Sequence, residues 1–259
     1  MNYLLAPIAA LGRVIITFIT ETGSILILLF LALRNSLRRP YRFKLILEQM
    51  EFIGVNSMGI ITLTGFFTGA VFALQTGKVF RLFNAEGYTG MVVGISLVRE
   101  LAPVLTSLMV AARAGSAIAA KLGTMRVTHQ IDALMVMAVD PVNYLIVPRF
   151  IATTLVMPVL TAYFDFIGIL GSYVVGVVLL GINEGIFVYR IEWMVDVGDI
   201  SHGLIKSSVF GALIAIISCH KGFYSGGGAE GVGRSTTEAV VLSSISIFVA
   251  DYVITALVI

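Results

Sequence analysis

The sequence predicts an all-α integral membrane protein with about five transmembrane helices. Of its 259 residues, 58% are hydrophobic and only 12% are charged, and the mean hydropathy is +0.99. A soluble domain carries about 25% charged residues. Several apolar runs also reach the roughly 20 residues that a helix needs to cross a bilayer. Long apolar runs with so few charges are typical of a bundle of membrane-spanning helices.

The remaining composition excludes several kinds of site. A net charge of +2 is too small to indicate nucleic-acid binding. The single cysteine, Cys219, cannot form an intrachain disulfide. The three histidines are scattered and no Cys/His spacing typical of a metal ligand set occurs. We therefore expect neither a metal nor a cofactor bound by this chain.

The first 51 residues are expected to form an interfacial and cytoplasmic region. Residues 3–33 are apolar, but Arg13 and Glu21 interrupt them, so that neither half comfortably supplies a span. They are interpreted as one or two helices in the membrane interface, with a single tilted span as the alternative. The basic cluster that follows places this region, and the N-terminus, on the cytoplasmic side under the positive-inside rule. It consists of Arg34, Arg38, Arg39, Arg42 and Lys44.

Five segments are predicted to cross the membrane. They are residues 52–76, 87–112, 150–180, 204–220 and 239–259. This layout puts 12 of the 17 lysines and arginines on the inside, in segments 1–51, 113–149 and 221–236. In the first span, Gly65 and Gly69 form a small-xxx-small pair, which predicts a close approach between two helices.

The longest stretch predicted not to span is 113–149. Within it Val127, Ile131, Leu134 and Ala138 recur at helical spacing, with polar residues off this apolar stripe. Asp140-Pro141 is expected to end the helix. The pattern fits equally a surface for a soluble partner and a helix lying flat on lipid headgroups.

Arg99 and Glu100 are adjacent charges inside the second predicted span. They lie about 18 Å along its helix at 1.5 Å per residue, a depth at which ionisable groups usually face a polar cavity or a partner. They therefore line a cavity or pair with Asp165, Lys206 or Asp251. Aromatic residues nearby either line an apolar cavity or serve packing, and include Phe66, Phe67, Phe72, Phe80 and Phe83.

The glycine-rich segment before the last predicted span resembles a phosphate-binding loop. Gly228 to Ser235 matches that pattern except that Arg234 replaces its lysine. A membrane span rather than a strand precedes it, so no nucleotide site is expected. Ser235 and Glu238 have the spacing of a capping box and are predicted to open the last span.

Three motifs together resemble the MlaE/YrbE permease family. They are SLVRELAPVL, ARAGSAIAAKLGTMRVTHQIDALMVMAVDPVNYLIVPR and GAEGVGRSTTEAVV, in this order. The resemblance covers roughly residues 40–259 and implies that residues 1–259 form a single permease domain. It implies a homodimer in a bacterial inner membrane, on two copies of a cytoplasmic ABC ATPase that binds the ATP and magnesium. A periplasmic Mce-domain lipid-binding protein would lie above it, and the cargo would be phospholipid moved between inner and outer membranes.

The resemblance also assigns residues to two sites. The segment from about 122 to 140 would be a cytoplasmic coupling helix that docks into the ATPase. Its residues are Leu122, Met125, Arg126, Val127, His129, Ile131, Asp132, Leu134 and Asp140. A lipid cavity at the dimer interface would be lined by Phe72, Val79, Phe80, Phe83, Arg99, Glu100 and Leu101.

This sequence departs from the family pattern in the coupling segment. Lys121, His129 and Met135 stand where family members commonly carry glutamate, so the electrostatic match to an ATPase should differ. The leading hypothesis is a permease subunit without catalytic activity of its own. The alternatives are a structural anchor that only tethers an Mce ring, and a membrane enzyme that binds nucleotide at 228–235.

Overall fold

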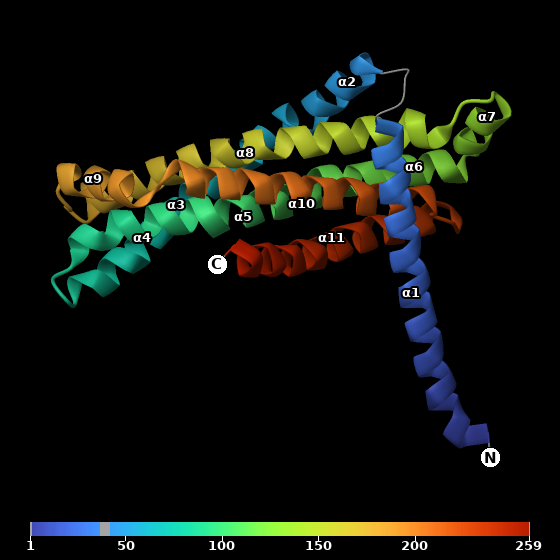
Figure 1. Ribbon diagram of the computed structural model, residues 1–259, viewed down its shortest axis with the longest axis horizontal. Coiled ribbons are helices and arrows are strands. Elements are labelled where there is room, and N and C mark those ends of the chain that lie inside the picture. Colours follow the sequence, from blue (N-terminus) through green and yellow to red (C-terminus); the bar gives the residue numbers. More distant parts are fainter. Residues whose placement is uncertain (1, 37–41, 259) are drawn as a thin grey trace.

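The computed structural model describes residues 2–36 and 42–258, and shows helices and their connecting turns with no strand in these ranges. The long helices lie side by side as an elongated bundle (Figure 1). Helix α7 (Gln130–Val136) lies at one end, and α4 (Thr89–Ser96) and α9 (Glu184–Met194) reach the other end. The all-α prediction is confirmed.

Most spans are built from several helical segments that continue one another. The first consists of α2 (Phe43–Ile53), the 3-10 turn η1 (Val55–Ser57) and α3 (Met58–Arg81). A short turn, η2 (Glu86–Tyr88), leads into the second span. That span continues from α4 through η3 (Leu97–Leu101), α5 (Ala102–Val110), η4 (Ala111–Gly115) and α6 (Ser116–Val127). The third comprises η5 (Val142–Ile146), α8 (Val147–Tyr173) and η6 (Val174–Leu179). The last two are α10 (Val197–Phe223) and α11 (Gly228–Val258).

The second span is longer than the sequence predicted. Its helical segments run without a break over 86–127, and the next begins at Val142. Residues 113–127 and 142–149 therefore continue the helices of the second and third spans, so 113–149 is not a separate segment between them. The small-residue run after Arg113 contains no helix breaker, so the helix continues. Only the turns around α7 separate the two spans.

The N-terminal region is a single long helix, α1 (Asn2–Ser36). By length and composition alone, six helices of the described chain could cross a membrane, and the first of these segments is Ile19–Ser36. However, α1 runs across the long axis of the bundle near the end that carries α7, and its N-terminal part projects away (Figure 1). This direction is the one expected of a helix in the membrane interface.

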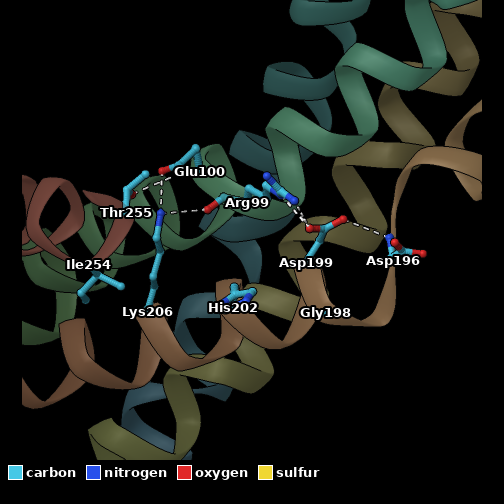
Figure 2. A pocket seen from close by; sticks show the side chains of 9 residues that line it. All are labelled: Arg99, Glu100, Asp196, Gly198, Asp199, His202, Lys206, Ile254 and Thr255. Carbon is cyan, nitrogen blue, oxygen red and sulfur yellow. Dashed lines mark hydrogen bonds and ion pairs between the residues drawn. The ribbon is translucent and has the colours of Figure 1, made fainter. Parts of the chain in front are cut away.

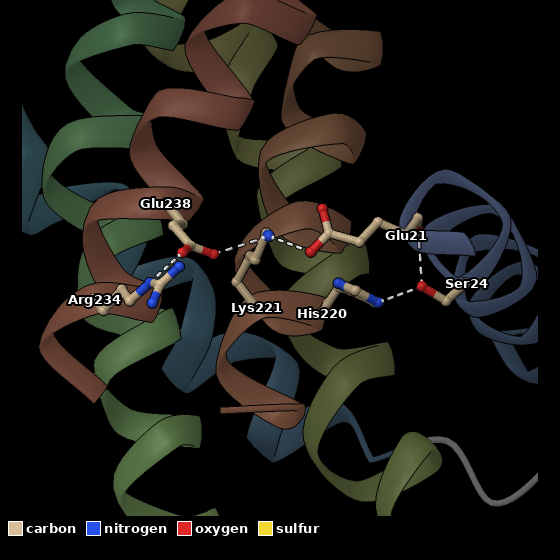
Figure 3. Close-up of polar contacts among 6 residues, drawn as sticks. All are labelled: Glu21, Ser24, His220, Lys221, Arg234 and Glu238. Atoms are coloured by element: carbon tan, nitrogen blue, oxygen red, sulfur yellow. Dashed lines mark hydrogen bonds and ion pairs between the residues drawn. The ribbon is translucent and has the colours of Figure 1, made fainter. Parts of the chain in front are cut away.

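Charged side chains attach α1 to the two last spans (Figure 3). We call Glu21, Lys221, Arg234 and Glu238 the inner ion cluster. Lys221 Nζ lies 2.9 Å from Glu21 Oε1 and 3.0 Å from Glu238 Oε2. Arg234 Nε donates to the other oxygen of Glu238 at 2.8 Å. One lysine thus joins α1, α10 and α11, while Ser24 and His220 form a second hydrogen bond between α1 and α10 at 2.7 Å.

The predicted capping box at Ser235 and Glu238 is wrong. Helix α11 already begins at Gly228, so both residues lie inside it. Gly227 and Gly228 have φ of +83° and +71°, a region that glycine adopts without strain, and they make the turn that starts the helix. The Glu238 carboxylate is used in the inner ion cluster instead.

The predicted close approach of two helices at Gly65 and Gly69 is confirmed. A Cβ on Gly69 would lie 1.9 Å from the carbonyl oxygen of Gly168 in α8. A Cβ on Gly171 of α8 would lie 2.2 Å from the carbonyl oxygen of Phe66. Backbone meets backbone here, so α3 and α8 can pack at this distance only through glycine.

We expect Gly69→Ala to destabilise the protein by about 1–3 kcal/mol, because the added methyl group forces α3 and α8 apart. The measurement is the apparent melting temperature of the purified protein in detergent. Gly59→Ala is the matched control in the same helix, since a Cβ there has nothing within 4 Å. Equal melting temperatures for the two variants would contradict the packing.

We expect Lys221→Met to loosen α1, because Glu21 loses its ion-pair partner on α10. Hydrogen exchange of backbone amides in residues 19–29, measured by mass spectrometry, should become faster. Arg234→Met is the control, since Arg234 is exposed and contacts only Glu238 of this cluster. Unchanged exchange in Lys221→Met would show that other contacts hold α1.

Candidate functional site

A charged hollow opens where η3, the start of α10 and the end of α11 meet (Figure 2). It has a volume of about 450 Å³. Its lining consists of Arg99, Glu100, Asp196, Gly198, Asp199, His202, Lys206, Ile254 and Thr255. We call it the charged pocket. It contains both residues that the sequence singled out inside the second span.

Arg99 is held by an aspartate at the start of α10. Its Nε and Nη2 lie 2.6 and 2.5 Å from Asp199 Oδ1. The other oxygen of Asp199 accepts from the backbone N–H of Asp196 at 3.0 Å, which completes a capping box. Asp199 is almost completely buried, whereas the Arg99 side chain is 54% exposed. The guanidinium therefore keeps a free face toward the hollow.

Lys206 connects three elements at the base of the charged pocket. Its Nζ lies 2.7 Å from Glu100 Oε2 and 3.1 Å from Asp251 Oδ1. Thr255 of α11 donates to the second oxygen of Glu100 at 3.4 Å. The lysine side chain is only 5% exposed, whereas the Glu100 side chain is 41% exposed. A buried cation thus fixes a carboxylate that still reaches the hollow.

A proline explains a further contact of this lysine. In a regular α-helix the carbonyl of Arg99 would accept from the N–H of residue 103, but Pro103 has no N–H. The helix adopts a π-turn over Leu97–Leu101 immediately before it. The Arg99 carbonyl instead accepts from Lys206 Nζ at 3.2 Å. Pro103 therefore frees an acceptor at the charged pocket.

The other predicted cavity residues lie elsewhere. Phe72 and Leu101 line a second, largely apolar hollow of about 490 Å³, together with Thr64, Phe67, Thr68, Val71 and Gln75. We call it the α3 groove. Val79 and Phe83 are 53% and 74% exposed near the outer end of α3, and Phe80 is half-buried. These three line neither hollow in the single chain.

The inner segment is not one continuous helix. Helix α6 ends at Val127, and His129 adopts a left-handed conformation with φ of +58° before α7 begins. The predicted stripe is therefore divided, with Ile131 and Leu134 in α7 and Ala138 in a second left-handed turn. Histidine tolerates this conformation better than most residues. The predicted helix over 122–140 is replaced by two helices and a turn.

Polar contacts stabilise the turn between α6 and α7. Asp132 Oδ2 lies 3.0 Å from His129 Nδ1, and its Oδ1 accepts from Arg126 Nη1 at 2.6 Å. The hydrogen bond with His129, together with Arg126, holds the pKa of Asp132 below its usual range. A depressed pKa stabilises the folded turn at pH above about 3.8 and the effect is lost only as the pH falls further. Asp132 is therefore ionised at neutral pH.

Asp140 and Pro141 begin the third span rather than ending α7. Asp140 Oδ1 accepts from the backbone N–H of Val142 at 2.9 Å, so it caps the new helix. Proline is favoured at a first helical position because the N–H it lacks would be unpaired there. Asn35 of α1 donates to the other oxygen of Asp140 at 3.4 Å. The expectation that this dipeptide stops the preceding helix is wrong.

The apolar side chains of the inner segment divide into buried and exposed sets. Leu122 and Ile131 are completely buried. Met125, Val127 and Leu134 are half-buried. The consecutive residues Met135, Val136 and Met137 are 50%, 89% and 64% exposed. These three residues define an apolar tip at the C-terminal end of α7, the helix that lies at one end of the bundle (Figure 1).

Comparison with known proteins identifies the family. Residues 46–257 match the family described as Permease MlaE. The chain belongs to the MlaE permease family. This permease is 46% identical over 248 residues to a probable ABC transporter permease protein of Rickettsia felis, covering 96% of each chain. It is 39% identical over 251 residues to the intermembrane phospholipid transport system permease protein MlaE of Haemophilus influenzae, again covering 96% of each.

A further relative comes from a plant. The permease is 42% identical over 210 residues to the chloroplastic protein TRIGALACTOSYLDIACYLGLYCEROL 1 of Arabidopsis thaliana, which covers 81% of this chain and 60% of the relative. Family membership and the apolar helices together show that this is a multi-pass membrane protein.

Sequence reasoning missed one main partner in the charged pocket of the permease. Asp199 was assigned to an outer segment, although the Asp196-x-x-Asp199 spacing could have indicated a helix start there. Lys206 and Asp251 were named as possible partners of Arg99 or Glu100. Lys206 does pair with Glu100, and Asp251 is the second ion-pair partner of Lys206. Asp165, named with them, forms no ion pair among the described residues.

We expect Lys206→Met to lower the melting temperature of the permease by roughly 4–10 °C, because two carboxylates lose their shared cation. Adding Glu100→Gln and Asp251→Asn should recover part of the loss, since neutral side chains need no counter-charge. Thermal unfolding in detergent measures both effects. A triple variant less stable than Lys206→Met alone would contradict this electrostatic account.

Proposed function

We propose that this protein is the membrane subunit of an ABC transporter that moves phospholipids between the inner and outer membranes of a bacterium. ATP is hydrolysed by a separate cytoplasmic subunit, and the permease itself has no catalytic site. The charged pocket carries this proposal. It presents the Arg99 cation and the Glu100 carboxylate, each partly exposed, within a membrane-spanning bundle. The phospholipid transport named for the Haemophilus relative supports it.

The charges of the pocket match a phospholipid headgroup. The free face of the Arg99 guanidinium suits a phosphate, to which arginine donates two hydrogen bonds. The Glu100 carboxylate suits the amine of a zwitterionic headgroup. Both residues belong to η3, and so does Leu101, which lines the apolar α3 groove. A headgroup at Arg99 would thus have an apolar surface for its acyl chains along the same π-turn.

The permease works as a homodimer in this proposal. The exposed face of α3 carries Leu63, Phe67 and Val71 at i, i+4 and i+8, with 61%, 58% and 49% exposure. Such an apolar stripe contacts lipid or a second protomer. A second copy on this face would close the α3 groove into an enclosed cavity for acyl chains, to which Val79, Phe80 and Phe83 contribute at the outer end.

A cytoplasmic ATPase binds the inner end, one copy for each protomer. The apolar tip of Met135, Val136 and Met137 projects there beside Arg126 and His129. Lys121, His129 and Met135 occupy places where the family commonly has glutamate, so the partner surface is expected to be less basic than is usual. A periplasmic Mce-domain protein binds the outer end, where Phe83 and Trp193 are 74% and 62% exposed.

The test of transport uses the double variant Arg99→Ala/Glu100→Ala. The complex purified with its partner subunits should retain about tenfold less phospholipid than wild type, because the headgroup loses two charged contacts. Native mass spectrometry with lipid identification measures the occupancy. Lys78→Ala/Glu192→Ala removes the same two charge types from exposed positions and is the control. Unchanged occupancy in the Arg99/Glu100 variant would favour a structural anchor instead.

The test of ATPase docking uses Val136→Asp. A carboxylate in the apolar tip should reduce co-purification of the ATPase by about tenfold, because a charge cannot be buried in an apolar contact without loss of affinity. Val197→Asp is the matched control, since Val197 is 80% exposed at the outer end. Ile131→Asp does not test docking, because Ile131 is completely buried and its substitution unfolds α7. Normal co-purification of Val136→Asp would refute docking at the tip.

A further inference from the structure

A small hollow lies between α2, α6 and α8, away from the charged pocket. Its volume is about 190 Å³, and its lining consists of Glu48, Gln49, Phe52, Ala117, Ile118, Lys121 and Arg149. Glu48 and Lys121 are exposed at its rim, whereas Ile118 and Arg149 are buried at its base. The hollow is thus open at one side and ends on a guanidinium.

Arg149 is a buried cation without a counter-charge. It is only 5% exposed, and its Nη1 donates to the backbone carbonyl of Leu145. Its Nε has no hydrogen-bond partner among the described residues. Every aspartate and glutamate of the chain lies in the described ranges, and none of them pairs with Arg149 or Lys121. Burial of an unpaired charge is costly, so the site requires an anion.

A third cation adds to the positive field behind the hollow. Arg113 precedes Ala117 and Lys121 at i+4 and i+8, so all three share one helix face. Its Nη1 donates to the carbonyl of Phe52 at 2.7 Å and to Ser57 Oγ at 2.9 Å, and the guanidinium lies 5.1 Å from the Phe52 ring centre. Arg113 therefore has no carboxylate partner either among the described contacts. Glu48 is the one carboxylate that lines the hollow.

The hollow lies toward the end of the bundle that the positive-inside rule assigns to the cytoplasm. Arg149 follows the inner turn at Asp140 by nine residues, about 13 Å along the helix at 1.5 Å per residue. Arg42, the N-cap residue of α2, adds a further positive charge at the start of that helix. Basic pockets between transmembrane helices at the cytoplasmic side are suited to phospholipid headgroups.

We propose that the hollow between α2, α6 and α8 binds the phosphate group of an inner-leaflet phospholipid, held by Arg149 and Lys121. The phosphate neutralises the buried guanidinium, and the Glu48 carboxylate at the rim meets any amine of the headgroup. This lipid is a bound component that joins α2 to α6 and α8, distinct from cargo in the charged pocket. The site does not depend on whether the protein transports lipid.

The test places a photoreactive benzoylphenylalanine at Gln49 in the full chain, in nanodiscs of phosphatidylcholine of which a fraction is radiolabelled. Illumination should attach the labelled lipid at Gln49. Lys121→Glu should weaken this labelling about tenfold, because the new carboxylate pairs with Arg149 and repels phosphate. Lys44→Glu, the same reversal at an exposed position that does not line the hollow, should leave it unchanged.

Three unlabelled compounds and a second probe position define the ligand. Unlabelled phosphatidylglycerol should compete at Gln49, whereas diacylglycerol and inorganic phosphate should not. Effective competition by diacylglycerol would overturn the proposal, and so would labelling of Lys121→Glu equal to that of the wild type. Displacement of the lipid by inorganic phosphate would also overturn it, because it would indicate a site for free anions. A benzoylphenylalanine at Ile254 reports on the charged pocket. A loss of labelling at Ile254 alone would therefore contradict lipid binding in the charged pocket and leave the hollow between α2, α6 and α8 unaffected.

Discussion

A lysine ammonium buried within a membrane-spanning bundle must be neutralised and fully hydrogen-bonded, and this requirement organises the centre of the protein. Lys206 is only 4% exposed; its hydrogen-bond acceptors come from η3, and α11 supplies the second carboxylate of its ion pairs, Asp251. The relative positions of three spans are therefore fixed by one cation. Because the Glu100 side chain is still 41% exposed, its carboxylate reaches the charged pocket (Figure 2). The ion pair between Lys206 and Glu100 thus contributes both to the stability of the bundle and to the position of a carboxylate in the charged pocket.

The inner end repeats this arrangement with a different consequence. Lys221 joins two carboxylates from α1 and α11, and so attaches α1 to the spans (Figure 3). Between α8 and α6, however, Arg149 has no such partner. The chain therefore neutralises its buried cations with its own carboxylates at Lys206 and Lys221, and relies on an external anion at Arg149. That difference separates a structural ion cluster from a ligand site.

The sequence predicted the helical class and the glycine contact because each depends on composition or on local spacing. It located Arg99 and Glu100 for the same reason, since charges within an apolar run stand out. It missed Asp199 because an acidic residue at a helix start looks like an ordinary loop residue until the partner helix is known. The π-turns and the left-handed His129 were also missed, because they arise from Pro103 and from tertiary contacts rather than from periodicity. Asp140-Pro141 is ambiguous by nature, since proline is compatible with both the end and the start of a helix.

The central claim is that the charged pocket and the α3 groove hold a phospholipid in an ABC transporter complex. The most direct test is to purify the wild-type protein from its native membrane with its associated subunits, under mild detergent, and to analyse it by native mass spectrometry with lipid identification. The account predicts a dimer that carries two ATPase copies, an Mce-domain oligomer and bound phospholipid. A single chain that retains neither partner nor phospholipid would contradict it.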